Sequence, residues 1–264
     1  MGKLPGTEWM GIEAVKMVWT MDEWIEKLET VGVRTAIFDC DGTLWSGDSG
    51  YGFMQWSMEQ GLISREMSEW MDARHRAYEA GEVYEAQICG EMVQVYAGLR
   101  EEEIRSASEV FVQQYVRKRH FHEMETLVAW LRKRGVELWA VSSTHRWVIE
   151  AGLAAFGISA GNVLAAAVRV QDGRLTEELV DVPTDEAKAT ALRRVGIDAP
   201  DAVFGNSVHD LAMLEMARIP VPVNASAGLR RACAERGWSR LEPEGADGGE
   251  DVVMAAALDI QPGD

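Results

Sequence analysis

The sequence predicts an α/β fold with a mainly parallel sheet and a helical insertion after its first strand. Three observations lead to this prediction. Helical and strand patterns alternate along most of the chain, which is typical of parallel strand and helix units. A helical stretch of about ninety residues separates the first two expected strands, far more than one crossover helix needs. Two acidic residues, Asp39 and Asp41, directly follow the first apolar run, where open α/β sheets keep their ligand crevice.

The core elements follow in chain order from apolar spacing. Apolar residues at helical spacing predict an amphipathic helix over 21–31 that covers the core, and the run 35–38 predicts the first strand. A helix over 124–133 should end at Arg134-Gly135, and a strand over 136–141 should follow it. Further strands are expected at 163–170, 202–204 and 220–223, and further helices at 147–156, 186–195 and 210–217.

The insertion has the pattern of successive helices separated by glycines. They are expected over 50–60, 64–80, 83–96 and 101–116, as a small bundle beside the crevice. From Pro243 onward periodicity fades, and we expect roughly the last twenty residues to be loosely packed. The predicted division is a helical N-terminal segment over 1–33 that packs on the core, an α/β core over 34–47 and 120–264, and a helical cap over 48–119.

Composition argues against several kinds of partner. The 264 residues carry 26 basic and 43 acidic side chains, a net charge of −17, which disfavours nucleic acid and anionic membranes. No stretch approaches the roughly 20 apolar residues of a membrane span, and no apolar signal core follows the start. Cys40, Cys89 and Cys233 have no metal-ligand spacing and suit a reducing compartment. We therefore expect a soluble, cytoplasmic protein, of an oligomeric state that the sequence leaves open.

Four motifs follow one another along the chain, each at an expected strand end or helix start. They are Asp39-Cys40-Asp41-Gly42-Thr43, Val141-Ser142-Ser143-Thr144, Lys188, and Gly205-Asn206-Ser207-Val208-His209-Asp210. In this order they resemble the motifs of the haloacid dehalogenase superfamily, over about Arg34 to Val223. The helical insertion resembles the C1-type cap of its phosphoserine-phosphatase-like branch. A polar turn is the alternative for Asp39 and Asp41 alone, and the other three motifs argue against it.

The resemblance implies a Rossmann-like core and hydrolysis of a small phosphate monoester. Asp39 would be the nucleophile that forms an aspartyl phosphate, and Asp41 would protonate the leaving oxygen and then activate water. Ser142, the amide of Ser143, and the loop residues Gly42 and Thr43 would bind the phosphoryl oxygens. Lys188 would neutralise the charge that nucleophile and phosphoryl group share. The second aspartate favours a phosphatase, since dehalogenases lack it and P-type ATPases have lysine there.

A magnesium ion is the implied cofactor. Asp39, the backbone carbonyl of Asp41, and Asp210 would supply the hard oxygen ligands that Mg²⁺ prefers. The family usually has aspartate where this chain has Asn206, which would coordinate through its amide oxygen or hold a metal-bound water. We expect weaker Mg²⁺ binding than with aspartate, but not its loss.

Two residues are candidates for binding the rest of the substrate. In the phosphoserine phosphatases an acidic residue nine positions after the nucleophile contacts the amine, and Asp48 has this position here. No arginine near Gly90 matches their carboxylate-binding arginine, which favours phosphoethanolamine or phosphocholine over phosphoserine. Trp45, with the aromatic residues Tyr51, Phe53 and Trp56 that follow it, could supply cation–π contacts. The alternatives are that Asp48 caps a helix and that the aromatic residues are core.

Two other functions stay open from the sequence. An alcohol that replaced water at the same intermediate would make the chain a phosphotransferase. Alternatively, Asn206 could mark a catalytically weakened module that binds phosphate without turnover.

Overall fold

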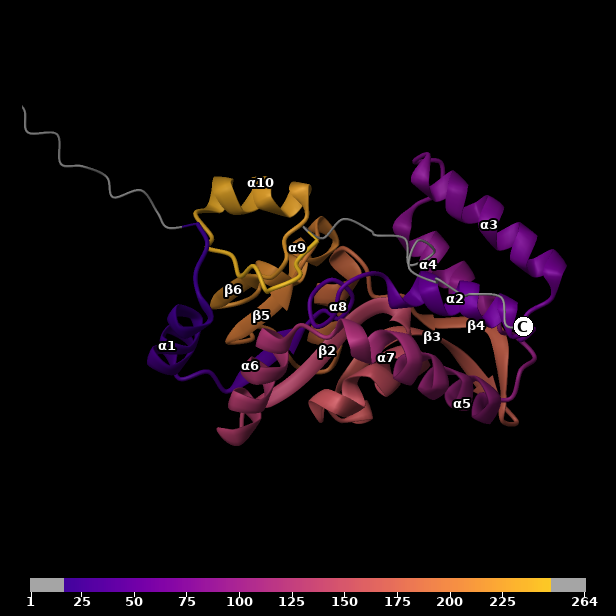
Figure 1. The fold of residues 1–264 in the computed structure, drawn as a ribbon, viewed down its shortest axis with the longest axis horizontal. Coiled ribbons are helices and arrows are strands. Elements are labelled where there is room, and N and C mark those ends of the chain that lie inside the picture. Colours follow the sequence, from indigo (N-terminus) through magenta and orange to yellow (C-terminus); the bar gives the residue numbers. More distant parts are fainter. Residues whose placement is uncertain (1–16, 248–264) are drawn as a thin grey trace, which may run out of the picture.

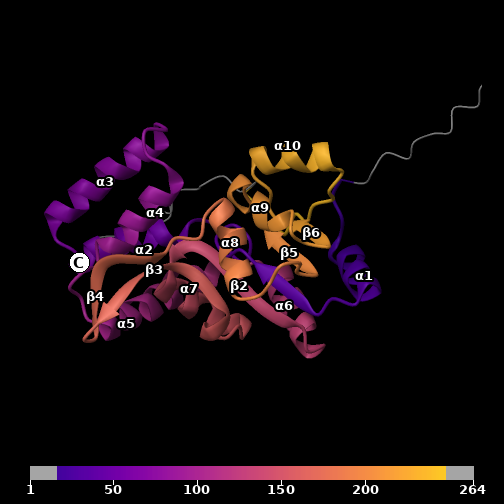
Figure 2. The ribbon, with the colours of Figure 1, turned by 180° about the vertical axis from the view of Figure 1, so that it is seen from behind.

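The structure, a computed structural model, describes residues 17–247. Its described part contains one sheet of six strands in the order β4-β3-β2-β1-β5-β6 (Figures 1 and 2). Neighbouring strands are parallel except β3 and β4, which are antiparallel. The strands are β1 (Thr35–Phe38), β2 (Glu137–His145), β3 (Val163–Gln171), β4 (Arg174–Asp181), β5 (Ala202–Gly205) and β6 (Ile219–Pro222). The predicted α/β fold with a mainly parallel sheet is confirmed.

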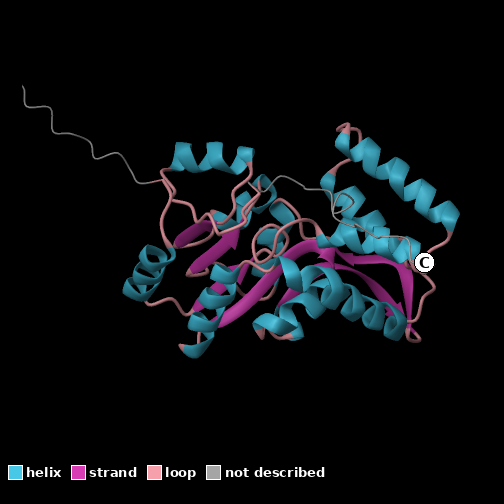
Figure 3. Ribbon diagram, in the orientation of Figure 1, coloured by secondary structure: helices cyan, strands magenta, loops and turns pink. Residues whose placement is uncertain are grey.

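Helices cover both faces of the sheet (Figure 3). The α-helices are α1 (Met21–Val31), α2 (Ser49–Glu59), α3 (Arg65–Glu79), α4 (Glu85–Gln94), α5 (Glu101–Phe111), α6 (His122–Lys133), α7 (Arg146–Leu153), α8 (Glu186–Arg194), α9 (Leu211–Leu214) and α10 (Ala227–Arg236). In β1, Ala36 and Phe38 join the apolar cluster formed with α1 to α7, whereas Ile37 joins the cluster formed with α8 to α10. Strands buried on both faces are typical of parallel sheets.

The helix in front of the first strand forms for local reasons. The side chain of Thr20 caps α1 by accepting from the amide of Glu23, and the carboxylate of Glu23 accepts from the amide of Thr20. Gly32 ends α1 at φ 67°, a conformation that glycine adopts without a steric penalty. The buried residues Trp24 and Leu28 then pack α1 on the core, as its spacing predicts.

The insertion is helical as expected, but its helices do not form a bundle with a core of its own. One apolar cluster runs without a break from these helices to the sheet. Helix α4 packs on β2, β3 and β4, and α5 packs on α7 (Figure 1). The loop before α5 also pairs with the turn between β3 and β4, since Gly98 N donates to Leu175 O at 2.8 Å and Glu101 N to Gly173 O at 2.9 Å. The cap is thereby fixed to the antiparallel hairpin.

Two elements are missing from the sequence-based expectations. Strand β4 lies at the sheet edge with most side chains exposed, so it lacks the apolar run of a buried strand. The Asp172-Gly173 pair, with φ of 51° and 71°, was the available signal, because this dipeptide is typical of tight hairpin turns. The available signals for helix α10 were Ser226, which caps its start, and Gly237, which ends it.

The predicted loose packing of the chain end is wrong for residues 243–247. The amide of Glu244 donates to the Glu123 carboxylate at 2.8 Å, and the buried Asn224 donates to the Asp247 carboxylate at 2.7 Å. Residues 1–16 and 248–264 lie outside the described part, including the rest of this segment and the beginning of the predicted 1–33 unit. The proposed domain boundaries stay a prediction.

None of the helices within residues 17–247 combines the length and apolarity that crossing a bilayer requires.

Candidate active site

The predicted motifs meet at one edge of the sheet, around a cavity of about 570 Å³. Asp39 and Asp41 follow β1, Ser142 and Ser143 lie near the end of β2, and Asn206 follows β5. Since these three strands are neighbours and parallel, their carboxyl ends come together. Lys188 reaches the same cavity from the first turn of α8. The cap supplies the opposite wall, through residues of α2, α3 and α4.

Asp39 is buried and held at fixed orientation. Its amide continues the β1 pairing by donating to Phe204 O at 2.9 Å, and its carboxylate accepts from Thr43 Oγ1 at 3.0 Å and Lys188 Nζ at 2.7 Å. Burial, together with the negative charge of Asp210, raises the pKa of Asp39 to about 7, although Lys188 acts in the opposite direction. A buried carboxylate whose ionised form is disfavoured by burial and by a neighbouring carboxylate is suited to a site that gains a cation.

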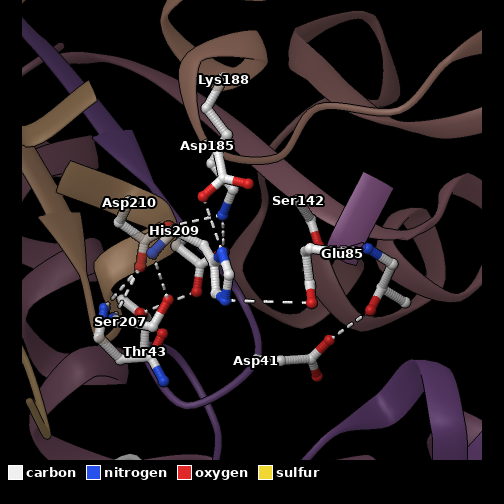
Figure 4. A network of polar contacts seen from close by, with 12 residues as sticks. Asp41, Thr43, Glu85, Ser142, Asp185, Lys188, Ser207, His209 and Asp210 are labelled. Atoms are coloured by element: carbon white, nitrogen blue, oxygen red, sulfur yellow. Dashed lines mark hydrogen bonds and ion pairs between the residues drawn. The ribbon is translucent and has the colours of Figure 1, made fainter. Parts of the chain in front are cut away.

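Lys188 joins two carboxylates. Its Nζ also donates to Asp210 Oδ1 at 2.6 Å, and all three side chains are nearly inaccessible to solvent (Figure 4). Although burial alone would lower it, Asp210 and Asp39 raise the pKa of Lys188, which is therefore a fixed positive charge. The other oxygen of Asp210 accepts from the amides of Asn206 and Ser207 at 2.9 and 3.0 Å.

Asp41 lies at the entrance to the cap with its carboxylate fully engaged. Oδ1 accepts from Trp45 Nε1 at 2.6 Å and from the amide of Ser49 at 2.8 Å, and Oδ2 accepts from Thr144 Oγ1 at 2.7 Å. Three donors from three segments fix the carboxyl group beside the cavity that it lines. Ser142, whose hydroxyl accepts from the Thr144 amide at 3.1 Å, faces it across the same cavity.

Gly42 is required by its surroundings. Its φ is 73°, and a Cβ built there would lie 2.0 Å from Nδ2 of Asn206, so a side chain would displace that amide. The Gly42 carbonyl accepts from Asn224 Nδ2 at 3.2 Å, which ties the loop to the segment after β6. Gly42 and Asn206 both line the cavity, in contact with each other.

The oxygen donors at this site fit a hard divalent cation. Two buried carboxylates, Asp39 and Asp210, repel each other, and the one ammonium of Lys188 is shared between them. No three His, Cys, Asp or Glu side chains between residues 17 and 247 converge in a metal-binding arrangement. A cation would therefore also need the carbonyl of Asp41 and the amide of Asn206, the mixed oxygen set that Mg²⁺ accepts together with water.

Two predicted ligand contacts have other roles in the structure. Thr43 was expected to bind phosphate, but its side chain is fully buried, its hydroxyl donates to Asp39 and its amide to Cys40 O. Trp45 was expected to contact the substrate, but it is 1 % exposed, packs against Phe156 and is absent from the cavity wall. Both therefore position the two aspartates, since Trp45 donates to Asp41.

Of the residues expected to contact the substrate at the entrance to the cap, some line the cavity and others are buried in the core. Asp48 lines the cavity and also caps α2, because its Oδ1 accepts from the Tyr51 amide at 2.9 Å. Phe53 and Trp56 are buried in the core, which was the alternative to a contact with the substrate. Tyr51 does line the cavity, where its ring stacks on His75 with 4.0 Å between centroids.

Sequence reasoning missed Glu85, and for His209, which lies in the fourth motif, it favoured packing at a helix start over a contact with the substrate. The His209 ring lies between Asp185, whose Oδ1 is 2.8 Å from Nδ1, and Glu85, whose Oε2 is 3.9 Å from Nε2 (Figure 4). Although burial would lower it, Glu85 and Asp185 raise the pKa of His209. Glu85 comes from the cap, and no motif marks it in the sequence.

His145, the last residue of β2, is expected to make stability depend on pH. Burial lowers its pKa from 6.5 to about 3, and neither ring nitrogen has a hydrogen-bond partner within residues 17–247. The unfolded chain binds this proton below pH 6.5 and the folded chain does not, so stability falls as the pH falls through this range. We expect His145→Leu to remove about 2 kcal/mol of the loss between pH 7 and pH 5. Urea unfolding at both pH values measures it.

The exposed His122 supplies the control for this experiment. His122→Gln should retain the acid sensitivity of the unchanged chain. An equal sensitivity in His145→Leu would contradict the assignment of the effect to burial of His145.

Comparisons with known proteins agree with this geometry. A family model of haloacid dehalogenase-like hydrolases matches residues 36–215. The chain is 26% identical over 217 residues to a histidinol-phosphatase of Neisseria meningitidis serogroup C, across 78% of this chain and 97% of that protein. It is 25% identical over 214 residues to a protein of Mycobacterium tuberculosis H37Rv named as a probable phosphatase, across 78% and 74% of the two chains.

Solved structures share the fold. A protein of unknown function from Bordetella pertussis Tohama I superposes with a TM-score of 0.72 at 24% identity, covering 79% of this chain and 98% of that one. A substrate-bound phosphoserine phosphatase superposes with a TM-score of 0.54 at 16% identity, covering 80% and 92%. The model match spans most of the chain and includes all four motifs. This chain therefore belongs to the haloacid dehalogenase-like hydrolases.

Proposed function

We propose that the chain hydrolyses a small, amine-bearing phosphate monoester with the help of Mg²⁺, through an aspartyl phosphate at Asp39. The observation that carries this proposal is the buried Asp39, Lys188 and Asp210 triad beside Asp41, opening on one cavity. Covalent catalysis needs a nucleophile held in a fixed place and an acid within reach of the leaving group. Both residues lie in one loop after β1.

In this mechanism Asp39 attacks phosphorus and Asp41 protonates the leaving oxygen. Asp41 then takes a proton from the water that hydrolyses the aspartyl phosphate. Trp45, Ser49 and Thr144 hold its carboxyl group in place through both steps. The cap wall limits access of bulk water and restricts the site to small esters.

Lys188 and the cation would neutralise the negative charge of the phosphoryl group. Asp39, the Asp41 carbonyl, Asn206 and Asp210 would hold Mg²⁺, which when bound supplies positive charge at the phosphoryl oxygens. Lys188 stabilises the same oxygens from the protein side, and Ser142 and the Ser143 amide offer hydrogen bonds at the end of β2. Such preorganised donors are typically the largest contribution to catalysis of this type.

The charge of the cavity wall supports a cationic substrate. Among the described residues, Lys188 is the only lysine or arginine that lines the cavity, and it is already paired with Asp39 and Asp210. Asp48, by contrast, adds a negative charge on the cap side. The relative named histidinol-phosphatase, whose substrate carries an amine, supports the same class.

Phosphate release from a panel of esters tests the proposal. The panel contains histidinol phosphate, phosphoethanolamine, phosphocholine, phosphoserine and p-nitrophenyl phosphate, each with Mg²⁺ or with EDTA. We expect release that depends on Mg²⁺ and is fastest with an ester that carries an amine and no carboxylate. A folded chain that releases no phosphate from any ester would overturn the proposed activity.

Asp48→Ala tests the amine preference. Loss of a charge-assisted hydrogen bond should raise KM for the preferred amine ester roughly tenfold or more, and spare p-nitrophenyl phosphate. The cap role of Asp48 costs about 1 kcal/mol of stability in any case, so the steady-state assay is paired with a thermal melt. Equal losses on both substrates would reduce Asp48 to a helix cap.

A further inference from the structure

Glu85 is a cap carboxylate with an unsatisfied oxygen. It is the first residue of α4, and its side chain is 16% exposed. Oε1 accepts weakly from the Cys89 thiol at 3.4 Å, whereas Oε2 is shielded from solvent and has no hydrogen-bond donor in the described part of the chain. The ring nitrogen Nε2 of His209 is 3.9 Å from Oε2, beyond hydrogen-bond distance. An unpartnered buried carboxylate oxygen is costly unless a ligand supplies the donor.

Glu85 and Asp48 face the same part of the cavity. Between them lies the partly buried Cys89, whose thiol donates to Glu85 Oε1 at 3.4 Å, and burial together with the charges of Glu85 and Asp48 raises the pKa of this thiol well above its usual range. All three residues line the cavity, which Ser143 of the phosphate loop also lines.

The negative charges of Glu85 and Asp48 on the cap wall of the cavity favour a cationic ligand. A carboxylate-bearing substrate would meet Glu85 and Asp48 without an arginine to pair with, and like charges brought together cost free energy. An ammonium group supplies several N–H donors, which match the open oxygen of Glu85 and a second carboxylate. The polarity thus runs from a phosphate end at Lys188 to a cation end at Glu85, the first residue of α4.

We propose that Glu85 binds the cationic group of the substrate together with Asp48, and so determines the specificity of the phosphatase for amine esters. This inference rests on the proposed function but assigns a residue that no motif contains. On binding, the ammonium donates to Glu85 Oε2 in place of the long contact with His209. The cap then recognises the leaving group directly.

Glu85→Gln tests the proposal with two esters that differ in a single charged group, phosphoethanolamine and ethyl phosphate. We expect KM for phosphoethanolamine to rise roughly tenfold to a hundredfold, with ethyl phosphate changed less than about twofold. The control Glu82→Gln removes the same charge from an exposed cap residue outside the cavity wall and should change neither value.

Other outcomes would overturn this role. Equal losses on both esters would mean that Glu85 closes the cap through His209, and no change on either ester would mean that it is only an acidic residue at a helix start. Thermal melts of both variants separate these results from misfolding, since a glutamine retains the size and hydrogen-bonding capacity of the side chain.

A binding measurement keeps this test independent of turnover. In an Asp39→Asn background, equilibrium titration gives Kd for phosphoethanolamine and for ethyl phosphate. Adding Glu85→Gln should reduce the preference for phosphoethanolamine roughly tenfold or more. An unchanged preference overturns the role of Glu85, whereas a chain that binds both esters and hydrolyses neither refutes the phosphatase proposal alone.

Discussion

Replacement of Asp39 by Asn is expected to reduce phosphate release by roughly 10⁴-fold or more, because an amide cannot form the covalent intermediate. The fold should tolerate this change. Without divalent cations the pKa of Asp39 is raised from 3.8 to about 7 in the folded chain, so its ionisation costs stability as the pH rises between these two values, and the loss is complete at pH 8. The thermal midpoint of Asp39→Asn at pH 8 should therefore not fall below that of the unchanged chain.

The matched control is Asp198→Asn, which removes the same charge from an exposed loop. It should retain full activity with each ester. Single-turnover assays with acid quenching should detect a phosphorylated chain in the control and none in Asp39→Asn. Retention of more than a few per cent of activity by Asp39→Asn would refute Asp39 as the nucleophile.

Lys188→Met has the second large expected effect, on stability as well as activity. Removing the ammonium leaves Asp39 and Asp210 facing each other, 5% and 0% exposed, without a compensating charge. Breaking a buried ion pair from one side costs about 3–5 kcal/mol. Activity should fall by roughly a thousandfold, because Lys188 also stabilises the phosphoryl charge.

The pH dependence distinguishes this mechanism from a simple packing defect. In Lys188→Met the pKa of Asp39 should rise further, so protonation below that pKa relieves the repulsion. The loss of stability should therefore be larger at pH 8 than at pH 5, and addition of Mg²⁺ at pH 8 should recover part of it. Lys133→Met, on the exposed side of α6, should show neither effect. A loss that is equal at both pH values would indicate packing alone.

Much of the site was accessible from the sequence because its residues lie in short motifs at strand ends. Asp39 and Asn206 follow strands that apolar runs predict, Ser142 lies near the end of another, and parallel neighbours bring these strand ends together. Lys188 and Asp210 are close to helix starts, where local sequence fixes the backbone. Local pattern and fold agree at these positions.

The roles of Thr43 and Trp45 could not be predicted in the same way. Both belong to the loop that carries the aspartates, so a motif cannot tell whether they contact a ligand or hold Asp39 and Asp41. Burial decides, and burial depends on Phe156 and other residues far away in the sequence. Strand β4 could not be predicted because it is exposed at the sheet edge, and such a strand does not need an apolar run.

The sequence by itself determined the fold class, the order of the motifs and the chemistry of their side chains, since these depend on apolar periodicity and on residues close together in the chain. Only the tertiary structure decided which residues of the cap line the cavity opposite these motifs. Glu85 reaches the cavity because α4 packs on the β3 and β4 hairpin, whose turn pairs with the loop before α5. Those contacts join segments about eighty residues apart, and no local pattern specifies such long-range packing. The residues proposed to bind phosphate therefore lie in short sequence motifs, whereas Glu85, proposed to bind the cationic group, reaches the cavity through long-range packing.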